Sequence, residues 1–299
     1  MRRTIVLGFV LALGALAYVA AAQAPQTPSA AARDATRIEK VKDNLYVITG
    51  SGVGNTEAFS GGNTAVFITD TGVTLVDTKL PGFGPTLLER IKTVTDKPVT
   101  RIINTHAHGD HTGGNAFFAP PVEIVVHERA RANMNKERET RTYTDRLTIG
   151  SGRDRIDLYY FGRGHTGGDT FAVFPALRTM HAGDMFAWKG LPFIDPVAGG
   201  SVIEQPDSLA KAVATIRDVD TVISGHIPSS TWNDFKEYAD FVQDFVSYAK
   251  ASRQAGKSLD QAVTEYRVPA RFKGYVATVA SSVTPASNLK LAYAELNEQ

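Results

Sequence analysis

The sequence Thr-His-Ala-His-Gly-Asp-His-Thr-Gly-Gly occupies residues 105–114 and places three imidazoles and one carboxylate within six consecutive positions. A helix would turn positions i and i+2 in nearly opposite directions, and a strand would send neighbouring side chains to opposite faces. Neither element could aim these groups at one point, so we predict a loop. Three glycines in this stretch would allow its backbone to fold tightly around a ligand.

The residues before this loop, 99–104, form a β-branched run that predicts a buried strand. Loops that follow strands are common positions for functional residues. Imidazole nitrogens together with a carboxylate oxygen suit Zn²⁺ or a similar ion, which takes three or four such ligands. A histidine-rich surface loop is the alternative interpretation, but the H-x-H-x-D-H spacing is far more specific than an isolated histidine.

The H-x-H-x-D-H motif resembles that of the metallo-β-lactamase superfamily. The resemblance implies an α/β fold, a four-layer αβ/βα sandwich of two mixed sheets with outer helices. It also implies a site for two Zn²⁺ ions per chain, with iron or manganese as alternatives. By this resemblance the first ion is held by His106, His108 and His165, the second by Asp110, His111 and His226, and both by a bridging Asp184.

The later candidate ligands sit in similar surroundings. Residues 165–168 repeat the His-Thr-Gly-Gly of residues 111–114 after a predicted strand. Asp184 and His226 also follow predicted strands and lie next to glycine. Of the seven histidines, five therefore lie in the opening motif or at strand ends, a distribution that favours a single site.

Two further residues are candidates for supporting roles. Asp77 ends a predicted strand, and in the superfamily an Asp at this place supports the metal loop from behind. Capping of the following loop is an equal alternative. Lys189 lies a few residues after Asp184, near the place where secreted β-lactamases use a lysine to bind the substrate carboxylate, although the interval does not match. His127 ends an apolar strand, which favours a structural role.

Composition narrows the class of protein. The chain has 299 residues, 43% of them hydrophobic and 21% charged, which is typical of a globular protein. Its 32 basic and 31 acidic side chains leave a net charge of +1 without long runs of either sign, so we predict a small-molecule substrate rather than a nucleic acid. Because there is no cysteine, disulfides and thiolate metal ligands are excluded. The oligomeric state is not predicted.

The N-terminal residues have the layout of a secretory signal peptide. Met1-Arg2-Arg3 precedes an uncharged apolar run over residues 5–22 that ends in small side chains. We predict a signal peptide over 1–24 and a periplasmic or secreted protein without stable membrane insertion after cleavage. A retained membrane anchor is the alternative. Residues 25–37 are expected to be a flexible leader, and 38–299 the hydrolase domain, including C-terminal helices.

Periodicity and turn residues outline the remaining elements. Residues 140–152 have no clear period and fit either a lid or a surface loop. Aromatic residues at positions 232, 235, 238, 241, 245 and 248 predict a helix face that packs in the core. Residues 258–299 are expected to be helical, without a catalytic cluster. The other predicted strands are 44–48, 64–68, 73–76, 123–127, 155–161, 171–174, 177–181 and 221–224, and the other helices are 86–94, 128–139 and 208–219.

The resemblance also implies a reaction. In such sites a hydroxide shared by two ions, with a pKa lowered to about 7, is the nucleophile. Asp110 would orient it or move its proton. Thiolate-containing β-lactamases place Cys where this chain has Asp184, whereas glyoxalase II, lactonases and phosphodiesterases have Asp. We therefore predict a binuclear zinc hydrolase that cleaves a lactone, ester or amide. A β-lactamase, an exported phosphodiesterase and a non-enzymatic metal carrier or sensor are the alternatives.

Overall fold

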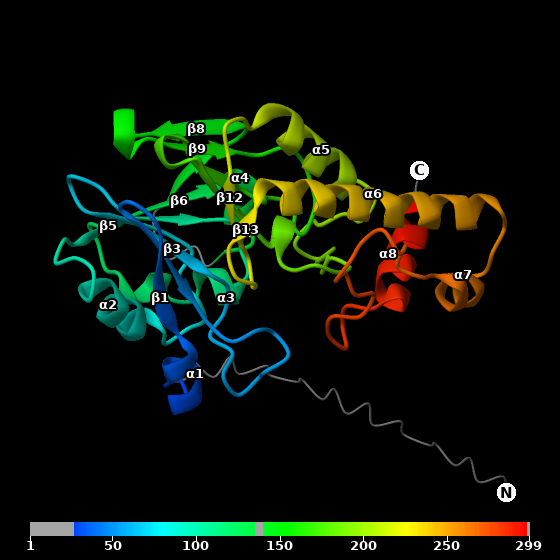
Figure 1. The fold of residues 1–299 in the computed structure, drawn as a ribbon, viewed down its shortest axis with the longest axis horizontal. Coiled ribbons are helices and arrows are strands. Elements are labelled where there is room, and N and C mark those ends of the chain that lie inside the picture. The colour runs from blue at the N-terminus through cyan, green and yellow to red at the C-terminus, as the bar shows by residue number, and fades with distance from the viewer. Residues whose placement is uncertain (1–26, 135–139, 298–299) are drawn as a thin grey trace, which may run out of the picture.

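Two mixed β-sheets lie against each other and carry helices on their outer sides, as Figure 1 shows. The computed structural model describes residues 27–134 and 140–297. The predicted signal peptide lies outside these residues, as does the end of the predicted helix 128–139. The expected four-layer αβ/βα sandwich is confirmed.

The first sheet has seven strands in sequence order, antiparallel from β1 to β4 and parallel from β4 to β7. Strand β1 was not predicted, because this edge strand is mostly polar and exposed and carries no clear alternation of apolar residues. The strands are β1 (Arg37–Lys42), β2 (Leu45–Thr49), β3 (Thr64–Ile68), β4 (Val73–Val76), β5 (Val99–Asn104), β6 (Glu123–His127) and β7 (Arg141–Tyr143).

The second sheet has six strands in the order β13-β12-β11-β10-β9-β8, with β11 and β12 parallel and the other neighbours antiparallel. Residues 140–152 form neither a lid nor an irregular loop, since β7 is an edge strand of the first sheet and β8 an edge strand of the second. The strands are β8 (Arg146–Ile149), β9 (Ile156–Tyr159), β10 (Phe171–Phe174), β11 (Thr179–Gly183), β12 (Thr221–Ser224) and β13 (Ser230–Thr231).

A short helix, α1, forms within the expected flexible leader 25–37. The Ser29 hydroxyl accepts a hydrogen bond from the Ala32 amide at 3.0 Å and caps this helix, and the Ala32 side chain is buried. The Arg90 guanidinium donates to the Arg33 and Thr36 carbonyls and holds the segment against α2. The helices are α1 (Ala30–Ala35), α2 (Gly84–Lys92), α3 (Gly109–Thr112), α4 (Glu128–Ala132), α5 (Gln205–Thr215), α6 (Trp232–Gln254), α7 (Leu259–Glu265) and α8 (Pro285–Asn297).

Three apolar clusters separate the four layers. In β3, Val66 faces α2 and packs in a cluster with Leu87, whereas Phe67 faces the second sheet and packs on Phe174 at 5.0 Å between ring centroids. This alternation follows from the two-residue period of a strand. The third and largest cluster fills the space between the second sheet and the helices α5, α6 and α8. Both faces of each sheet are thus covered near the centre of the molecule.

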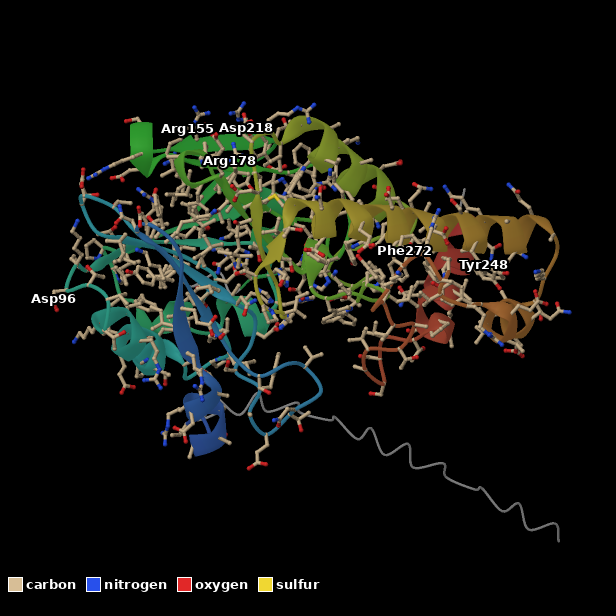
Figure 2. All side chains as sticks on the ribbon, in the orientation of Figure 1. Asp96, Arg155, Arg178, Asp218, Tyr248 and Phe272 are labelled. Carbon is tan, nitrogen blue, oxygen red and sulfur yellow. The ribbon has the colours of Figure 1, made fainter. Side chains whose placement is uncertain are left out.

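The aromatic face of α6 is part of the core, as predicted. Its residues Phe235, Tyr238, Phe241 and Phe245 are at most 1% exposed. Figure 2 shows Tyr248, on the same helix, in the region where α6, α7 and α8 meet, and its hydroxyl donates to the Ala262 carbonyl at 2.6 Å. Among the residues that the structure describes, no helix is long and apolar enough to cross a bilayer.

The expectation of helix throughout residues 258–299 was wrong for residues 266–284. This segment is irregular, because Pro269 cannot continue a helix and Gly274 has a positive φ of 80°. Phe272 and Tyr275 within it pack on Phe241 of α6, with ring centroids 5.2 and 4.6 Å apart. The irregular segment is therefore held in place by the aromatic core.

Candidate metal centre

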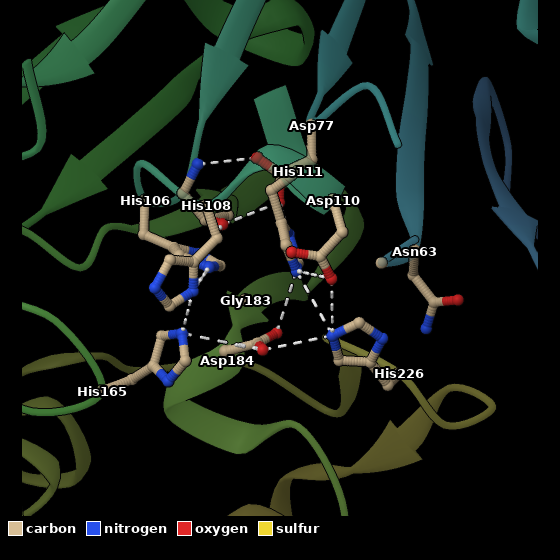
Figure 3. Close-up of polar contacts among 12 residues, drawn as sticks. Asn63, Asp77, His106, His108, Asp110, His111, His165, Gly183, Asp184 and His226 are labelled. Carbon is tan, nitrogen blue, oxygen red and sulfur yellow. Dashed lines mark hydrogen bonds and ion pairs between the residues drawn. The ribbon is translucent and has the colours of Figure 1, made fainter. Parts of the chain in front are cut away.

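The loop after β5 changes backbone conformation at His108, which is extended and directly precedes the one-turn helix α3. The Thr112 hydroxyl donates to the His108 carbonyl at 3.0 Å and closes this turn. The prediction that residues 105–114 form a loop is therefore only partly correct, because residues 109–112 form the helix α3. His106 and His108 precede the helix, whereas Asp110 and His111 belong to it, and this change of conformation brings all four side chains to one place (Figure 3).

Three imidazole nitrogens converge in a first group. The His108 Nδ1 atom lies 3.1 Å from His106 Nε2 and 2.9 Å from His165 Nε2. The opposite nitrogen of each ring lies close to an oxygen atom. The pairs are His106 Nδ1 with Thr105 Oγ1 at 3.0 Å, His108 Nε2 with Asp195 Oδ2 at 2.9 Å, and His165 Nδ1 with the Phe193 carbonyl at 2.6 Å. Metal-ligating histidines are usually oriented by a partner of this kind.

Asp110, His111 and His226 form a second group. The His111 and His226 Nε2 atoms lie 3.3 Å apart, and the Asp110 Oδ2 atom is 3.6 and 3.4 Å from them. Asn63 fixes the segment that carries His226, because its side-chain amide donates to the Ser224 and Ile227 carbonyls at 2.9 and 2.8 Å. The ring of His111 packs so closely on Gly62 that a Cβ atom there would lie 2.2 Å from its Cε1 atom.

Asp184 lies between the two groups (Figure 3). Its carboxylate oxygens are 3.2 Å from His111 Nε2, 3.1 Å from His226 Nε2 and 3.7 Å from His165 Nε2. Gly225 leaves room for this carboxylate, since a Cβ atom there would lie 2.0 Å from Asp184 Oδ1. Asp184 therefore contacts ligand-type nitrogens of both groups.

The two groups fit metal ions. Each has three ligand-type atoms within 4.8 Å of one another. Ligands that surround Zn²⁺ tetrahedrally at about 2.0–2.1 Å lie roughly 3.4 Å apart, which is close to the distances above. Among the described residues, Asp184 Oδ1 is buried without a hydrogen bond of good geometry, and the ligand-type nitrogen His111 Nε2 lies 3.2 Å from it. A buried carboxylate is costly unless a charged partner such as a cation lies beside it.

Charge within the cluster favours cation binding as well. Burial lowers the pKa of His106 well below its ordinary value, and the nearby His111 and His165 act in the same direction, so this ring stays neutral. Burial also opposes charge on His111, but Asp184, Asp110 and Asp77 outweigh it and hold the pKa of His111 well above the ordinary value. A metal cation can replace the proton that these carboxylates attract.

Asp77 lies behind the loop and outside the two groups. Its carboxylate accepts hydrogen bonds from the Thr105 amide, the Thr105 hydroxyl and His111 Nδ1, each at 2.7 Å. The Asp77 side chain is 0% exposed, so these three hydrogen bonds do not compete with water. Asp77 thus ties the end of β4 to both the start of the loop and a ring of the second group.

Lys189 does not join the cluster. Its ammonium group lies 2.6 Å from Asp234 Oδ1 and 3.8 Å from Glu237 Oε2, both on α6. His127 is also separate. Its Nε2 atom lies 2.5 Å from the Thr144 carbonyl, and its ring stacks on Tyr160 with centroids 3.9 Å apart. His127 thus has the contacts of a structural histidine.

Sequence reasoning missed Lys79. This lysine is 0% exposed, and its ammonium group donates to the Gly62 carbonyl at 2.9 Å, next to the ring of His111. Burial lowers the pKa of Lys79 from 10.5 to about 7, although Asp110 and Asp77 oppose this change. Its place two residues after Asp77 was the only available signal. Asp195, which orients His108, had no local pattern to reveal it.

The sandwich and its cluster of histidines and carboxylates define an αβ/βα metallohydrolase. Residues 59–226, which include the whole cluster, match the sequence profile of the Metallo-beta-lactamase superfamily, and the chain belongs to this superfamily. The protein is accordingly a metal-dependent hydrolase.

Individual relatives differ in what they act on. A metallo-beta-lactamase type 2 from Elizabethkingia meningoseptica is 27% identical over 257 residues, which cover 81% of this chain and 96% of that one. The 2,4-dinitroanisole O-demethylase subunit alpha from Nocardioides sp. (strain JS1661) is 34% identical over 156 residues, 49% of this chain and 45% of that one. The inverting sec-alkylsulfatase Pisa1 from Pseudomonas sp. has a similar fold, with a TM-score of 0.73 at 12% identity, covering 87% of this chain and 50% of that one.

Lys79 should make the stability of the metal-free protein depend on pH. Because its pKa is lower in the folded chain than in the unfolded chain, the unfolded state binds more protons between about pH 7 and 10.5. Lys79 should therefore contribute a rise of about 2 kcal/mol to the free energy of unfolding between about pH 7 and about pH 9, while the raised pKa of His111 contributes a change of opposite sign. Lys79→Met should remove most of this rise, measured by denaturant unfolding.

The matched control is Lys211→Met, which changes an exposed lysine of α5. In this control the free energy of unfolding should depend on pH as it does in the wild-type protein. An equal rise with pH in the Lys79→Met variant would show that Lys79 is not its source.

Proposed function

We propose that this protein is a binuclear zinc hydrolase that cleaves a lactone or an activated ester. His106, His108 and His165 would hold one ion, and Asp110, His111 and His226 the other, with Asp184 shared between them. The position of Asp184 supports this most directly, because its carboxylate reaches nitrogens of both groups within 3.7 Å. Zinc ions so placed supply Lewis acidity and make a bound water acidic enough to act near neutral pH.

The side chains around the ions have separate tasks in this proposal. Asp77, Asp195 and the Phe193 carbonyl orient three of the rings, which keeps a nitrogen of each ring directed inward. Asp110 is 23% exposed on its side chain, whereas that of Asp184 is only 6% exposed. Asp110 is therefore the carboxylate best placed to take a proton from an attacking water and pass it on.

Asp184 also bears on the choice of substrate. The chain has no cysteine, so this position provides a hard, negatively charged oxygen ligand instead of a thiolate. A negative charge between the two groups would lower the Lewis acidity of the ions, so they would stabilise a poor leaving group less. Lactones and activated esters need the least such assistance.

A β-lactamase is the second candidate, favoured by the relative from Elizabethkingia meningoseptica, which aligns along 96% of its length. The Nocardioides relative is a 2,4-dinitroanisole O-demethylase subunit, which adds that aryl ether to the compounds worth assaying. The alkylsulfatase shares the fold alone and adds no candidate substrate.

We also propose export to the periplasm or the medium. The support is the order of charged, apolar and small residues over positions 1–24. Intact-mass measurement of protein from its native host should give a mature chain starting at Gln23 or Pro25. A chain that still carries Met1 in the membrane fraction would instead indicate a retained anchor.

Metal content tests the binuclear assignment. Elemental analysis of the purified protein should find about two zinc ions per chain. His106→Ala should lower both the zinc content and kcat/KM, the latter by more than about a hundredfold, because an imidazole ligand is lost. His127→Gln, which changes a buried histidine outside the cluster, should keep both. A fully loaded wild-type protein with a single ion would remove the shared role of Asp184.

Turnover tests the reaction. Zinc-loaded protein should hydrolyse lactones or activated esters with kcat/KM above about 10⁴ M⁻¹s⁻¹ and a chromogenic cephalosporin far more slowly. Both measurements belong on one sample, so that metal loading is identical. The opposite order, a fast cephalosporin with unreactive lactones and esters, would make the second candidate correct.

A further inference from the structure

A cavity of about 260 Å³ opens onto the candidate metal centre. Four of its lining residues, His108, Asp110, Asp184 and His226, belong to the cluster. The others form what we call the apolar wall, although it includes one hydroxyl. These residues are Val53, Phe59, Trp188, Phe193, Ala280, Ser282 and Val283.

Aromatic rings of the wall flank both metal-binding groups. The Phe193 ring lies 5.9 Å from the His108 ring and 5.6 Å from the His165 ring, between centroids. On the other side, Phe59 and Trp188 lie 5.7 and 5.9 Å from the ring of His226. A bound substrate whose scissile bond meets the cluster would therefore contact aromatic carbon on two sides.

The apolar wall has few polar or charged groups that could bind a charged substrate. The Trp188 indole N–H donates to the Leu191 carbonyl at 2.8 Å, so this donor is already used within the protein. Among the described residues that line the cavity, none is lysine or arginine. Lys189, the next residue after Trp188, is instead engaged by Asp234 and Glu237. The Ser282 hydroxyl is the remaining polar group of the wall.

Backbone contacts fix the part of the wall that comes from the irregular segment. The Val276 amide donates to the Lys189 carbonyl, and the Leu191 amide donates to the Val276 carbonyl, both at 3.2 Å. Gly190 permits this approach, since a Cβ atom there would lie 2.8 Å from the Val276 oxygen. The Val283 amide closes a tight turn by donating to the Ala280 carbonyl at 3.0 Å. This part of the wall is thus held in place by main-chain hydrogen bonds.

From this geometry we infer that the apolar wall selects an uncharged substrate with one aromatic ring next to the scissile bond, most simply a neutral aryl ester. The inference rests on the proposed function. An apolar cavity of about 150 Å³ can hold benzene, so 260 Å³ accommodates a ring together with an ester group. In the reaction, water adds to the acyl carbon, the bond to the aryl oxygen breaks, and the products are a carboxylic acid and a phenol.

Charge selection is tested with two substrates of similar size and reactivity. We expect kcat/KM of the zinc-loaded chain for 4-carbamoylphenyl acetate to exceed that for 4-carboxyphenyl acetate at least about tenfold, because the wall offers a carboxylate no cation. Val53→Lys should reduce this ratio, because it adds a cation to the wall. Hydrolysis of the carboxylated ester at an equal or higher rate would overturn the inference while leaving the proposed function intact.

Binding of an aromatic ring is tested without turnover. The chain has two tryptophans, so in a Trp232→Phe variant Trp188 alone reports on the cavity. Nitrobenzene should quench its fluorescence saturably, and Phe193→Ala or Phe59→Ala should raise the Kd about tenfold. The control Phe117→Ala, at an exposed phenylalanine outside the cavity, should leave the Kd unchanged.

The two readouts separate the possible failures. Saturable quenching without hydrolysis of any ester or lactone would refute the proposed function but support the aromatic site. Hydrolysis of small aliphatic lactones together with unsaturable quenching would refute the aromatic site and leave the hydrolase.

Discussion

The buried carboxylate of Asp77 connects β4 to the loop that carries the candidate metal centre. It is fully buried and accepts three hydrogen bonds of 2.7 Å from Thr105 and His111. Hydrogen bonds to a charged acceptor are stronger than those between neutral groups, and an unpaired donor left behind in this place would be costly. These contacts join β4 to the loop after β5 and set the orientation of a ring in the second group. Lys79 contributes from the other side, because its ammonium group holds the Gly62 carbonyl against which that ring packs.

The convergence of seven ligand-type residues could be predicted because four of them are dense in sequence and the other three, which follow predicted strands, fill the positions that the family resemblance implies; the structure brings all seven together. What escaped prediction lacks such a pattern. Strand β1 is polar and exposed at an edge, so its apolar alternation is weak. The apolar wall gathers residues from Val53 to Val283, and only the packing of the irregular segment against residues 189–191 brings them to one cavity.

The two copies of His-Thr-Gly-Gly have different backbone structures, so these four residues do not determine the local conformation. Residues 111 and 112 end the helix α3, whereas residues 165–168 form an irregular turn. In the second copy the Asp169 carboxylate accepts hydrogen bonds from the Thr166 amide and hydroxyl at 2.8 and 2.7 Å, which closes that turn. The two glycine pairs do share a function, since each allows close approach of another backbone. A Cβ atom at Gly114 or Gly168 would lie 2.2 or 2.3 Å from a main-chain atom of Thr78 or Ala130.

The hydrogen bonds between Val276 and residues 189–191 attach a piece of the C-terminal region to the rim of the cavity. The groups proposed to hold metal all lie between His106 and His226, while this part of the rim begins fifty residues farther along the chain, at Val276. Changes in the loop over 279–283 can therefore reshape the cavity without altering a metal ligand or its hydrogen-bond partner. The residues proposed to perform hydrolysis and this part of the proposed selecting wall thus lie in separate stretches of the chain, so substitutions in this loop would alter substrate preference without changing the metal centre.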